Sequence, residues 1–578
     1  MSKDSITWKI GGEAGFGIMT TGVMFAKLAT RSGYHIFNYT EYPSLIRGGH
    51  NVMEVRFSST PIYSQEKGVD LLIALNKQTI DLHQSELKDG AGLVYDPEKV
   101  TINPGELSAK IVLLPIPLTK IIKEAGASPV MQNNVTLGAS CALFNLDLDI
   151  LFKLIEDEFA RKGEEVVAEN KKSAELGYQY VVNNLKGKFV KNLDHNDTQK
   201  LMVLSGNEAV GLGAIAAGCK FFCAYPMTPT SNLLSFLAEK AEKVGLVVKH
   251  AEDEIAVINM AIGASFAGVR SMVGTSGGGF SLMVEGLGLA GITETPVVIA
   301  MGQRPGPATG MPTWTGQADL KFLINASQDE FLRIILAPGD VAEAFTLTVE
   351  AFNLADIYQT PVFILCDKYL CEGYQSTPFF DSSKIKIDRG KTILQMEQKI
   401  TNYLRYQTTA DGISPRLLPG TKGVTFIANS YEHEENGLST EDSAERAKQV
   451  NKRNQKAITY QNNISQPTLY GSKEAEITLI GWGSTKGPVL QALTDINYQQ
   501  NGKSINFLHL THVWPLNNKA LTEILGQAKK KVMIEGNSFG QMEQIIREQT
   551  GIVMDDRFLK YDGRPFYPEE IITLLSRG

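Results

Sequence analysis

Three acidic residues stand directly before a segment that is otherwise almost without charge. Glu252, Asp253 and Glu254 precede IAVINMAIGASFAG, a run of apolar and small residues. Carboxylates in a first helical turn stabilise the helix dipole, so a purely structural role is one explanation. A helix this apolar is expected to be buried, however, and an acid at its start would be partly desolvated with a raised pKa. Such an acid suits proton transfer.

A proline-stiffened loop, YPMTPTS, follows the apolar run FFC. Pro226 and Pro229 restrict the backbone on either side of Thr228. In parallel α/β sheets, ligands bind in loops that follow the strands, which makes this loop a candidate binding segment. The alternative is an ordinary helix start capped by Thr230 or Ser231, and the loop taken by itself favours that alternative.

An arginine ends another apolar run. Arg304 follows VVIAMGQ and precedes the Pro/Gly-rich segment PGPATGMPT. A guanidinium fixed there can bind a carboxylate through two parallel hydrogen bonds. A salt bridge at a surface turn is the alternative. Between the acidic helix and this arginine, TSGGGFSLMVEGLGLAG predicts a further strand, glycine turn and helix.

A glycine turn near the N-terminus, GGEAGFG, joins a predicted strand to a predicted helix. Gly12, Gly15 and Gly17 permit close backbone approach, and a helix N-terminus attracts anions. The G-x-x-G-x-G spacing differs from the dinucleotide pattern, which disfavours a nicotinamide site. A tight structural turn is the favoured explanation and phosphate binding the alternative. Arg47, in YPSLIRGGH, could meet a phosphate or a carboxylate at a domain interface.

Parallel α/β sheets are expected to position these segments. Short apolar runs alternate with amphipathic stretches along most of the chain. With 578 residues, the chain exceeds the size of one core, about 250–300 residues. We predict three α/β blocks, with a polar, weakly periodic stretch between the second and the third. Within this stretch, EHEENGLSTEDSAERAKQVNKRNQK is expected to form an exposed loop and a charged helix. The expected limits are 1–190, 200–378 and 473–578 for the blocks, and 379–472 for the polar stretch.

Within the first block the expected elements can be placed more closely. The pattern predicts a helix over 19–32 and a helical tail over about 133–185. Strands are expected at 6–10, 52–57, 71–75, 92–95 and 111–116.

Composition disfavours several classes of protein. The net charge of −7 is opposite to what nucleic acids or acidic membranes attract. No run approaches the roughly 18 apolar residues of a membrane span, and the first residues lack an apolar signal segment, so we expect a cytoplasmic protein without a membrane partner. The five cysteines are scattered in largely apolar runs, which favours core positions over metal binding. We expect no metal on this chain.

Taken in order, the motifs resemble a known family. YPMTPTS, the Glu254 helix, TSGGGFSLM and GQRPGPATGMPT resemble the α-subunit signature of 2-oxoacid:ferredoxin oxidoreductases. GGEAGFG, EYPSLIRGGH and VDLLIAL resemble that family's γ component, and EGNSFGQMEQIIRE with YDGRPFYPEE resembles its transketolase-C-terminal-like domain. RLLPG, EHEENG and KRNQK fit the 2-oxoglutarate branch, in which γ and α are fused. The resemblance spans essentially the whole chain. It implies a γ-type Rossmann-like domain, a thiamine-diphosphate pyrimidine-binding-type domain and the transketolase-like one.

The resemblance implies roles for individual residues. Glu254 is similar to the glutamate that hydrogen-bonds the aminopyrimidine ring of thiamine diphosphate, although Glu252 and Asp253 compete with it by sequence alone. Thr228 and Arg304 match the threonine and arginine that hold the 2-oxoacid.

The loop that contains Thr228 would also supply contacts to the cofactor, through Tyr225 and Pro226. Several positions depart from the family pattern, which leaves side-chain specificity open. Gly278 stands where proline is usual, Ala308 replaces a serine, and NASQDEFLR replaces an HGE-type sequence.

The chain lacks a GDG motif and a cysteine cluster, so the resemblance places Mg²⁺ and a [4Fe–4S] cluster on a separate β subunit, in an α2β2 assembly. The implied reaction converts a 2-oxoacid, CoA and oxidised ferredoxin into acyl-CoA, CO₂ and reduced ferredoxin. 2-Oxoglutarate is the expected acid, with pyruvate or branched-chain and aryl 2-oxoacids as alternatives. A different class, a non-catalytic subunit that binds CoA or another phosphate compound through GGEAGFG, also stays open.

Overall fold

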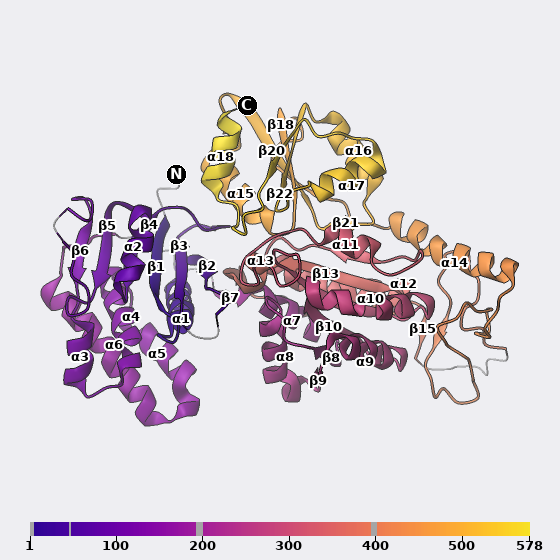
Figure 1. Ribbon diagram of the computed structural model, residues 1–578, viewed down its shortest axis with the longest axis horizontal. Helices are drawn as coiled ribbons and strands as arrows, with labels where there is room; N and C mark the ends of the chain where they lie inside the picture. Colours follow the sequence, from indigo (N-terminus) through magenta and orange to yellow (C-terminus); the bar gives the residue numbers. More distant parts are fainter. Residues whose placement is uncertain are drawn as a thin grey trace.

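The chain folds into an α/β protein with three large sheets, as predicted (Figure 1). The computed structural model describes residues 5–45, 48–103, 105–191, 193, 200–394 and 402–577. Within these ranges, no helix combines the length and the hydrophobicity of a membrane span. All five cysteines are buried, which confirms the prediction that they occupy the core.

The first sheet has eight strands, in the order β6-β5-β4-β1-β3-β2-β14-β7. Its last two strands come from beyond residue 200, so the sheet joins the N-terminal part of the chain to the middle part. The predicted domain limits stay a prediction. Two strands of this sheet, β7 and β14, come from the part of the chain that was predicted as the second block. The bounds are β1 Ser5–Glu13, β2 His35–Glu41, β3 His50–Ser58, β4 Val69–Ala74, β5 Leu87–Tyr95, β6 Val112–Pro115, β7 Leu201–Ser205 and β14 Tyr374–Pro378. Sequence patterns identified β1, β3, β4, β5 and β6 but not β2.

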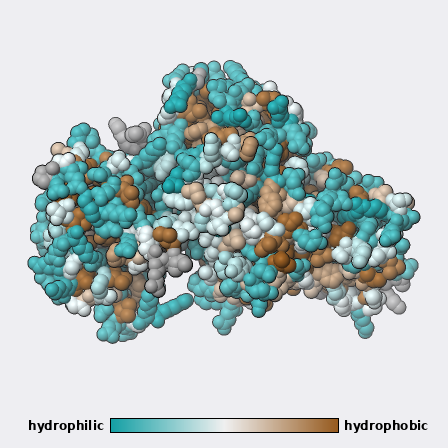
Figure 2. Space-filling model, in the orientation of Figure 1, coloured by the Kyte–Doolittle hydropathy of each residue, from teal (hydrophilic) through white to brown (hydrophobic). Residues whose placement is uncertain are grey.

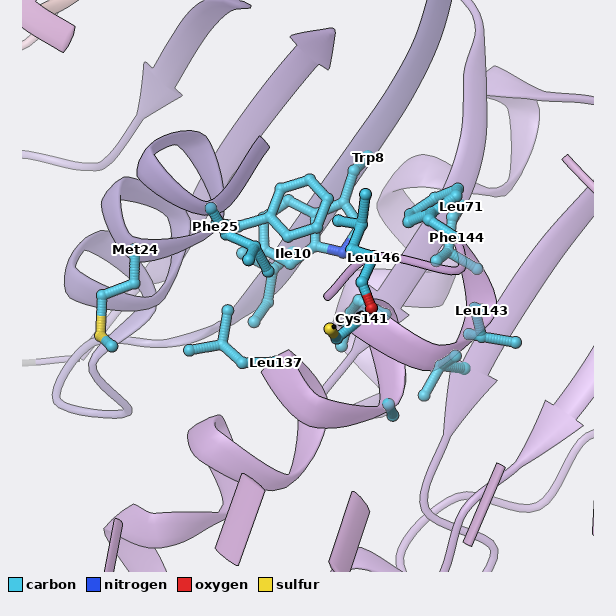
Figure 3. Packing of buried hydrophobic residues seen from close by; sticks show 14 of the residues in the cluster. Trp8, Ile10, Met24, Phe25, Leu71, Leu137, Cys141, Leu143, Phe144 and Leu146 are labelled. Atoms are coloured by element: carbon cyan, nitrogen blue, oxygen red, sulfur yellow. Dashed lines mark hydrogen bonds between the residues drawn. The ribbon is translucent and has the colours of Figure 1, made fainter. Parts of the chain in front are cut away.

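Helices cover this sheet and form its core with it (Figure 3). Trp8 of β1 stacks on Phe25 with 4.3 Å between ring centroids, and its Nε1 donates to Ser140 Oγ at 3.0 Å. Glycines let two helices touch, because a Cβ on Gly138 would lie 1.8 Å from the carbonyl oxygen of Ala174. The helices are α1 Ile18–Arg31, α2 Lys77–His83, α3 Leu118–Ala125, α4 Gln132–Leu143, α5 Leu148–Phe159 and α6 Glu164–Asn184.

The second sheet has seven strands, in the order β21-β12-β13-β11-β10-β8-β9, and all but β21 are parallel. The strands are β8 Phe221–Ala224, β9 Val247–His250, β10 Ser271–Ser276, β11 Val297–Gln303, β12 Ile334–Leu336, β13 Pro361–Asp367 and β21 His512–Trp514. The helices around it are α7 Gly206–Ala216, α8 Ser231–Val244, α9 Glu254–Phe266, α10 Gly277–Ile292, α11 Leu320–Asn325, α12 Val341–Tyr358 and α13 Lys368–Glu372.

The third sheet lies in the C-terminal part and packs on the second. One hydrophobic cluster contains both Ile299 of β11 and Trp482 of β18, so the two blocks share a core. The strands are β17 Thr468–Tyr470, β18 Ile477–Trp482, β19 Gln499–Gln500, β20 Lys503–Leu510, β22 Lys530–Glu535 and β23 Asp556–Leu559. The helices are α15 Lys486–Asp495, α16 Asn518–Gln527, α17 Gln541–Thr550 and α18 Pro568–Ser576.

The predicted charged helix exists as α14, Ser443–Gln461, and one of its faces is buried. Lys452 and Lys456 are buried and reach Glu294 at 2.5 and 2.6 Å. Arg405 Nη2 donates to the Glu294 carbonyl at 2.8 Å. Burial opposes ionisation of Glu294, but the two ammonium groups outweigh it and hold the pKa of this carboxyl well below its ordinary value. A charged sequence pattern cannot reveal such pairing, because the anion lies far away in the chain.

Candidate active site

The carboxyl edge of the second sheet brings the predicted residues of the middle block together. Thr228 follows β8, Glu254 follows β9, and Arg304 follows β11. In the sheet, β9, β8, β10 and β11 are consecutive neighbours, and they run parallel. Parallel strands end at the same edge, so three segments that are well separated in the chain meet there.

Glu254 is the buried acid of the three that compete in the sequence. It is the first residue of α9 and only 3% exposed, whereas Glu252 is exposed. Asp253 is the N-cap, and its side chain accepts a hydrogen bond from the Ala256 backbone N–H at 2.8 Å. Because Asp253 caps the helix, the Glu254 carboxyl is not needed as the cap and is available to bind a ligand.

The surroundings of Glu254 favour a protonated carboxyl. Burial raises its pKa, and the neighbouring charge of Asp253 acts in the same direction. Its Oε1 is buried and has no hydrogen-bond partner among the described residues. A Cβ on Gly279 would lie 2.3 Å from this oxygen, so the glycine turn of α10 makes room for the carboxyl. A buried carboxyl with a raised pKa and an unused oxygen can share a proton with a bound group.

Arg304 and the β8 loop are in direct contact. Arg304 Nη1 donates to the Thr228 carbonyl oxygen at 2.8 Å. The loop itself is fixed from behind, because Asn207 Nδ2 donates to the Pro229 carbonyl at 2.9 Å. Arg304 is partly exposed and has no ion-pair partner within the described ranges, which leaves donors for a carboxylate ligand. Burial lowers the pKa of Arg304, and the charge of Asp319 opposes that shift.

Asp319 is a residue of this edge that sequence patterns missed. Its backbone N–H donates to Gln303 Oε1 at 3.1 Å, beside Arg304. Burial raises the pKa of Asp319 to about 6, although the Arg304 charge pulls it down. The segment GQADLKF, in which it lies, has no glycine turn or apolar strand of its own that would have marked it. Only the return of the chain to the end of β11 reveals it.

Several buried polar atoms at this edge have unused hydrogen-bonding capacity. Besides Glu254 Oε1, they include Ser276 Oγ at the end of β10 and Gln303 Nε2 at the end of β11, neither of which has a hydrogen-bond partner among the described residues. Buried polar atoms are normally satisfied, so these atoms are available to hydrogen-bond a ligand that binds there.

Comparison with known proteins gives a consistent result. The family described as "Pyruvate flavodoxin/ferredoxin oxidoreductase, thiamine diP-bdg" matches residues 212–452, and "Pyruvate ferredoxin/flavodoxin oxidoreductase" matches 7–180. The 2-oxoacid:ferredoxin oxidoreductase subunit alpha of Saccharolobus solfataricus is 32% identical over 98% of this chain and 96% of its own length. This chain belongs to the 2-oxoacid:ferredoxin oxidoreductases, as an alpha subunit.

Two further relatives come from the 2-oxoglutarate branch of these oxidoreductases. A solved structure of the 2-oxoglutarate:ferredoxin oxidoreductase from Magnetococcus marinus, with 2-oxoglutarate, coenzyme A and succinyl-CoA bound, matches with a TM-score of 0.92 and 32% identity, covering 100% of both chains. The 2-oxoglutarate synthase subunit KorA of Methanothermobacter thermautotrophicus is 31% identical over 65% of this chain and 98% of its own length. The family predicted from the motifs is therefore confirmed.

Thiamine diphosphate fits the residues at this edge of the alpha subunit. The thiamine-diphosphate-binding family match includes all the predicted site residues of the middle block. The buried, unpartnered Glu254 Oε1 is suited to a ring nitrogen that carries or accepts a proton. Tyr225 and Pro226 are exposed on the β8 loop, where the Tyr225 ring meets His250 edge-on at 6.1 Å between centroids. Their contact with the cofactor stays a prediction.

The N-terminal glycine turn lies in the first sheet, away from this edge (Figure 1). β1 continues to Glu13, so Gly12 is a strand residue rather than part of the turn. Gly15 and Gly17 have φ of 97° and 69°, and Gly17 precedes α1. Arg47 lies outside the described residues. A CoA or phosphate role for this turn remains a prediction.

Proposed function

We propose that this chain is the α subunit of a 2-oxoglutarate:ferredoxin oxidoreductase, which forms succinyl-CoA, CO₂ and reduced ferredoxin from 2-oxoglutarate, CoA and oxidised ferredoxin. The observation that carries the proposal is the buried Glu254, whose Oε1 has no hydrogen-bond partner among the described residues, at the carboxyl edge of a sheet within the thiamine-diphosphate-binding family match. Family membership supplies the reaction class. The 2-oxoglutarate substrate is supported by the names of the KorA and Magnetococcus marinus relatives.

Each residue at the edge has a physical task in this reaction. Thiamine diphosphate, when bound, supplies the electron sink that decarboxylation of a 2-oxoacid requires. Glu254 holds a proton between its carboxyl and the cofactor's pyrimidine nitrogen, since burial favours the shared proton. Arg304 binds the 2-oxoacid carboxylate, and the Thr228 carbonyl fixes the guanidinium in place. Holding the cofactor and the 2-oxoacid in place before they react lowers the entropic cost of reaching a reactive geometry.

The remaining components belong to a partner subunit in this proposal. No group of side chains in the described part of the chain is arranged to hold a metal ion, and we assign Mg²⁺ and the [4Fe–4S] cluster to a β subunit in an α2β2 complex. Hydrophobic side chains gather near α9 and α10 on the surface (Figure 2). Ile255 is 52% and Leu282 49% exposed, beside a pocket of about 530 Å³. We propose that the β subunit covers this face, since exposed apolar patches mark interaction sites.

An assay of the reconstituted complex tests the proposed function. The chain is co-expressed with its partner subunit, and ferredoxin reduction is followed with CoA and a panel of 2-oxoacids. We expect the highest kcat/KM for 2-oxoglutarate. A preference for pyruvate or for a branched-chain or aryl 2-oxoacid would keep the chemistry and change the substrate. Absence of turnover with every 2-oxoacid, together with binding of CoA alone, would favour a non-catalytic binding subunit instead.

A further inference from the structure

Asp319 is an acid at the carboxyl edge for which the proposed reaction has no use so far. Both of its carboxylate oxygens face the first residue of α10, because a Cβ on Gly277 would lie 3.0 Å from Oδ2 and 3.3 Å from Oδ1. Its backbone N–H donates to the side chain of Gln303, the last residue of β11. Asp319 therefore lies where β10 ends and is hydrogen-bonded through its backbone to Gln303, the residue that precedes Arg304.

The charges around Asp319 leave it with one counter-charge. Arg304, at the end of β11, is the charged group that acts on it, and no ion-pair contact joins the two in the described part of the chain. Glu254 of α9 lies against Gly279, further along α10. Lys321 of α11 donates its Nζ to Gln544 of α17 instead. The first turn of α10 contains no titratable side chain.

We propose that Asp319 acts on Arg304 as a counter-charge without an ion-pair contact, and that the carboxylate of an incoming 2-oxoacid binds the free donors of Arg304 and competes with Asp319 for its charge. The inference rests on the proposed function, since it assigns Arg304 to the substrate. Arg304 is held by the Thr228 carbonyl rather than by Asp319, so its position does not require the acid. In this proposal, the negative charge of Asp319 weakens the binding of the substrate carboxylate to Arg304. Asp319 acts through Arg304 and touches no reacting atom.

Proton uptake on binding follows from this arrangement. Two carboxylates close to one guanidinium repel each other in a poorly solvated site, and one of them is relieved by protonation. Burial already raises the pKa of Asp319 to about 6 in the free chain. When the substrate carboxylate engages Arg304, Asp319 loses its compensating charge and takes a proton from solvent. Substrate affinity should therefore fall as the pH rises, by at most about 10-fold per pH unit for one linked proton.

Calorimetry on the assembled complex tests the inference. 2-Oxoglutarate is titrated into the complex without CoA, between about pH 6 and pH 8, in buffers of different ionisation enthalpy. The wild-type complex should take up a proton on binding above the Asp319 pKa. Asp319→Asn should bind about 3- to 10-fold more tightly at the upper end of this range and show no uptake, because the competing negative charge is gone. Asp319→Glu should restore the uptake, and the exposed Asp556→Asn should behave as wild type.

Each other outcome has a definite meaning. Unchanged affinity and uptake in Asp319→Asn would place the linked proton on another group, such as Glu254, and overturn the inference. Weaker binding would show that Asp319 holds the guanidinium in place mechanically, which also overturns it. If the wild-type complex neither binds nor turns over any 2-oxoacid, the proposed function fails, and the inference fails with it. Turnover in the wild type with no effect of Asp319→Asn removes the inference alone.

Discussion

Two buried glutamates, one at the carboxyl ends and one at the amino ends of the strands of the second sheet, differ in the pKa that their surroundings produce. Glu254 starts α9 at the carboxyl edge, has an unpartnered oxygen, and burial raises its pKa. Glu294 follows α10 at the other end, and Lys452 and Lys456 hold its pKa well below the ordinary value. Both side chains are almost fully buried. Burial by itself therefore does not mark a functional acid. Glu254 differs from Glu294 in that no cation among the described residues forms an ion pair with it.

Replacing Glu254 should have the largest effect of this comparison. Glu254→Gln keeps the size of the side chain but cannot share a proton in the same way. We expect kcat of the reconstituted complex to fall by about 10²- to 10⁴-fold. Thermal unfolding should show an intact fold, since Glu254 Oε1 has no hydrogen-bond partner among the described residues that the substitution could remove. Near wild-type turnover in this variant would contradict the role assigned to Glu254.

Replacing Glu294 should do the reverse and act on stability. Glu294→Gln leaves two buried ammonium groups without their anion, which should cost about 3–5 kcal/mol of unfolding free energy. Denaturant or thermal unfolding measures the loss. Turnover of the remaining folded complex should persist at low temperature. If the variant is as stable as wild type, the buried cluster does not anchor α14 as described.

Arg304 extends the comparison to cations. Among the described residues Arg304 has no ion-pair partner at the carboxyl edge, whereas Lys452 is paired with Glu294. Arg304→Ala should lower kcat/KM for the 2-oxoacid, mostly through a higher KM, because a carboxylate contact is lost. The fall should correspond to a loss of about 2–4 kcal/mol of transition-state stabilisation. Arg304→Lys, which keeps a charge but not the two-pronged geometry, should lie in between. An unchanged kcat/KM would show that Arg304 is structural.

The two glutamates should also give opposite pH dependences of stability, a smaller effect. The folded pKa of Glu254 is raised above the ordinary 4.5, so wild type should lose stability relative to Glu254→Gln as the pH rises through that raised value. The folded pKa of Glu294 is lowered, so its contribution is present above 4.5 and lost as the pH falls below it. Thermal midpoints of the three proteins from about pH 2 to pH 8 measure both slopes. Parallel curves would show that neither carboxyl has the environment described.

The local features of the site could be read from the sequence because they depend on neighbours in the chain. Asp253 caps α9, which places Glu254 at the helix start, and the glycines after β10 open space for its carboxyl. Successive strands of a parallel sheet bring such loops to one edge without further information. The family resemblance rested on the same short segments.

Long-range pairing could not be read from the sequence. β7 and β14 join a sheet that begins at residue 5, and β2 went unrecognised between its neighbours. Lys452 meets Glu294 across 158 residues, and Asp319 returns to Gly277 at the start of α10. A charged residue looks the same in sequence whether it is solvated or paired in the interior.

The sequence by itself determined the α/β class, the family and the segments that carry Glu254, Thr228 and Arg304. Helix caps, glycine turns and apolar strands depend on residues that are close together in the sequence, and these residues determine the local backbone geometry. Only the tertiary structure decided which of the three neighbouring acids is buried, which cations are neutralised, and that Asp319 shares the edge with Arg304. These outcomes depend on desolvation and charge pairing between distant segments, which exist only once the chain has packed.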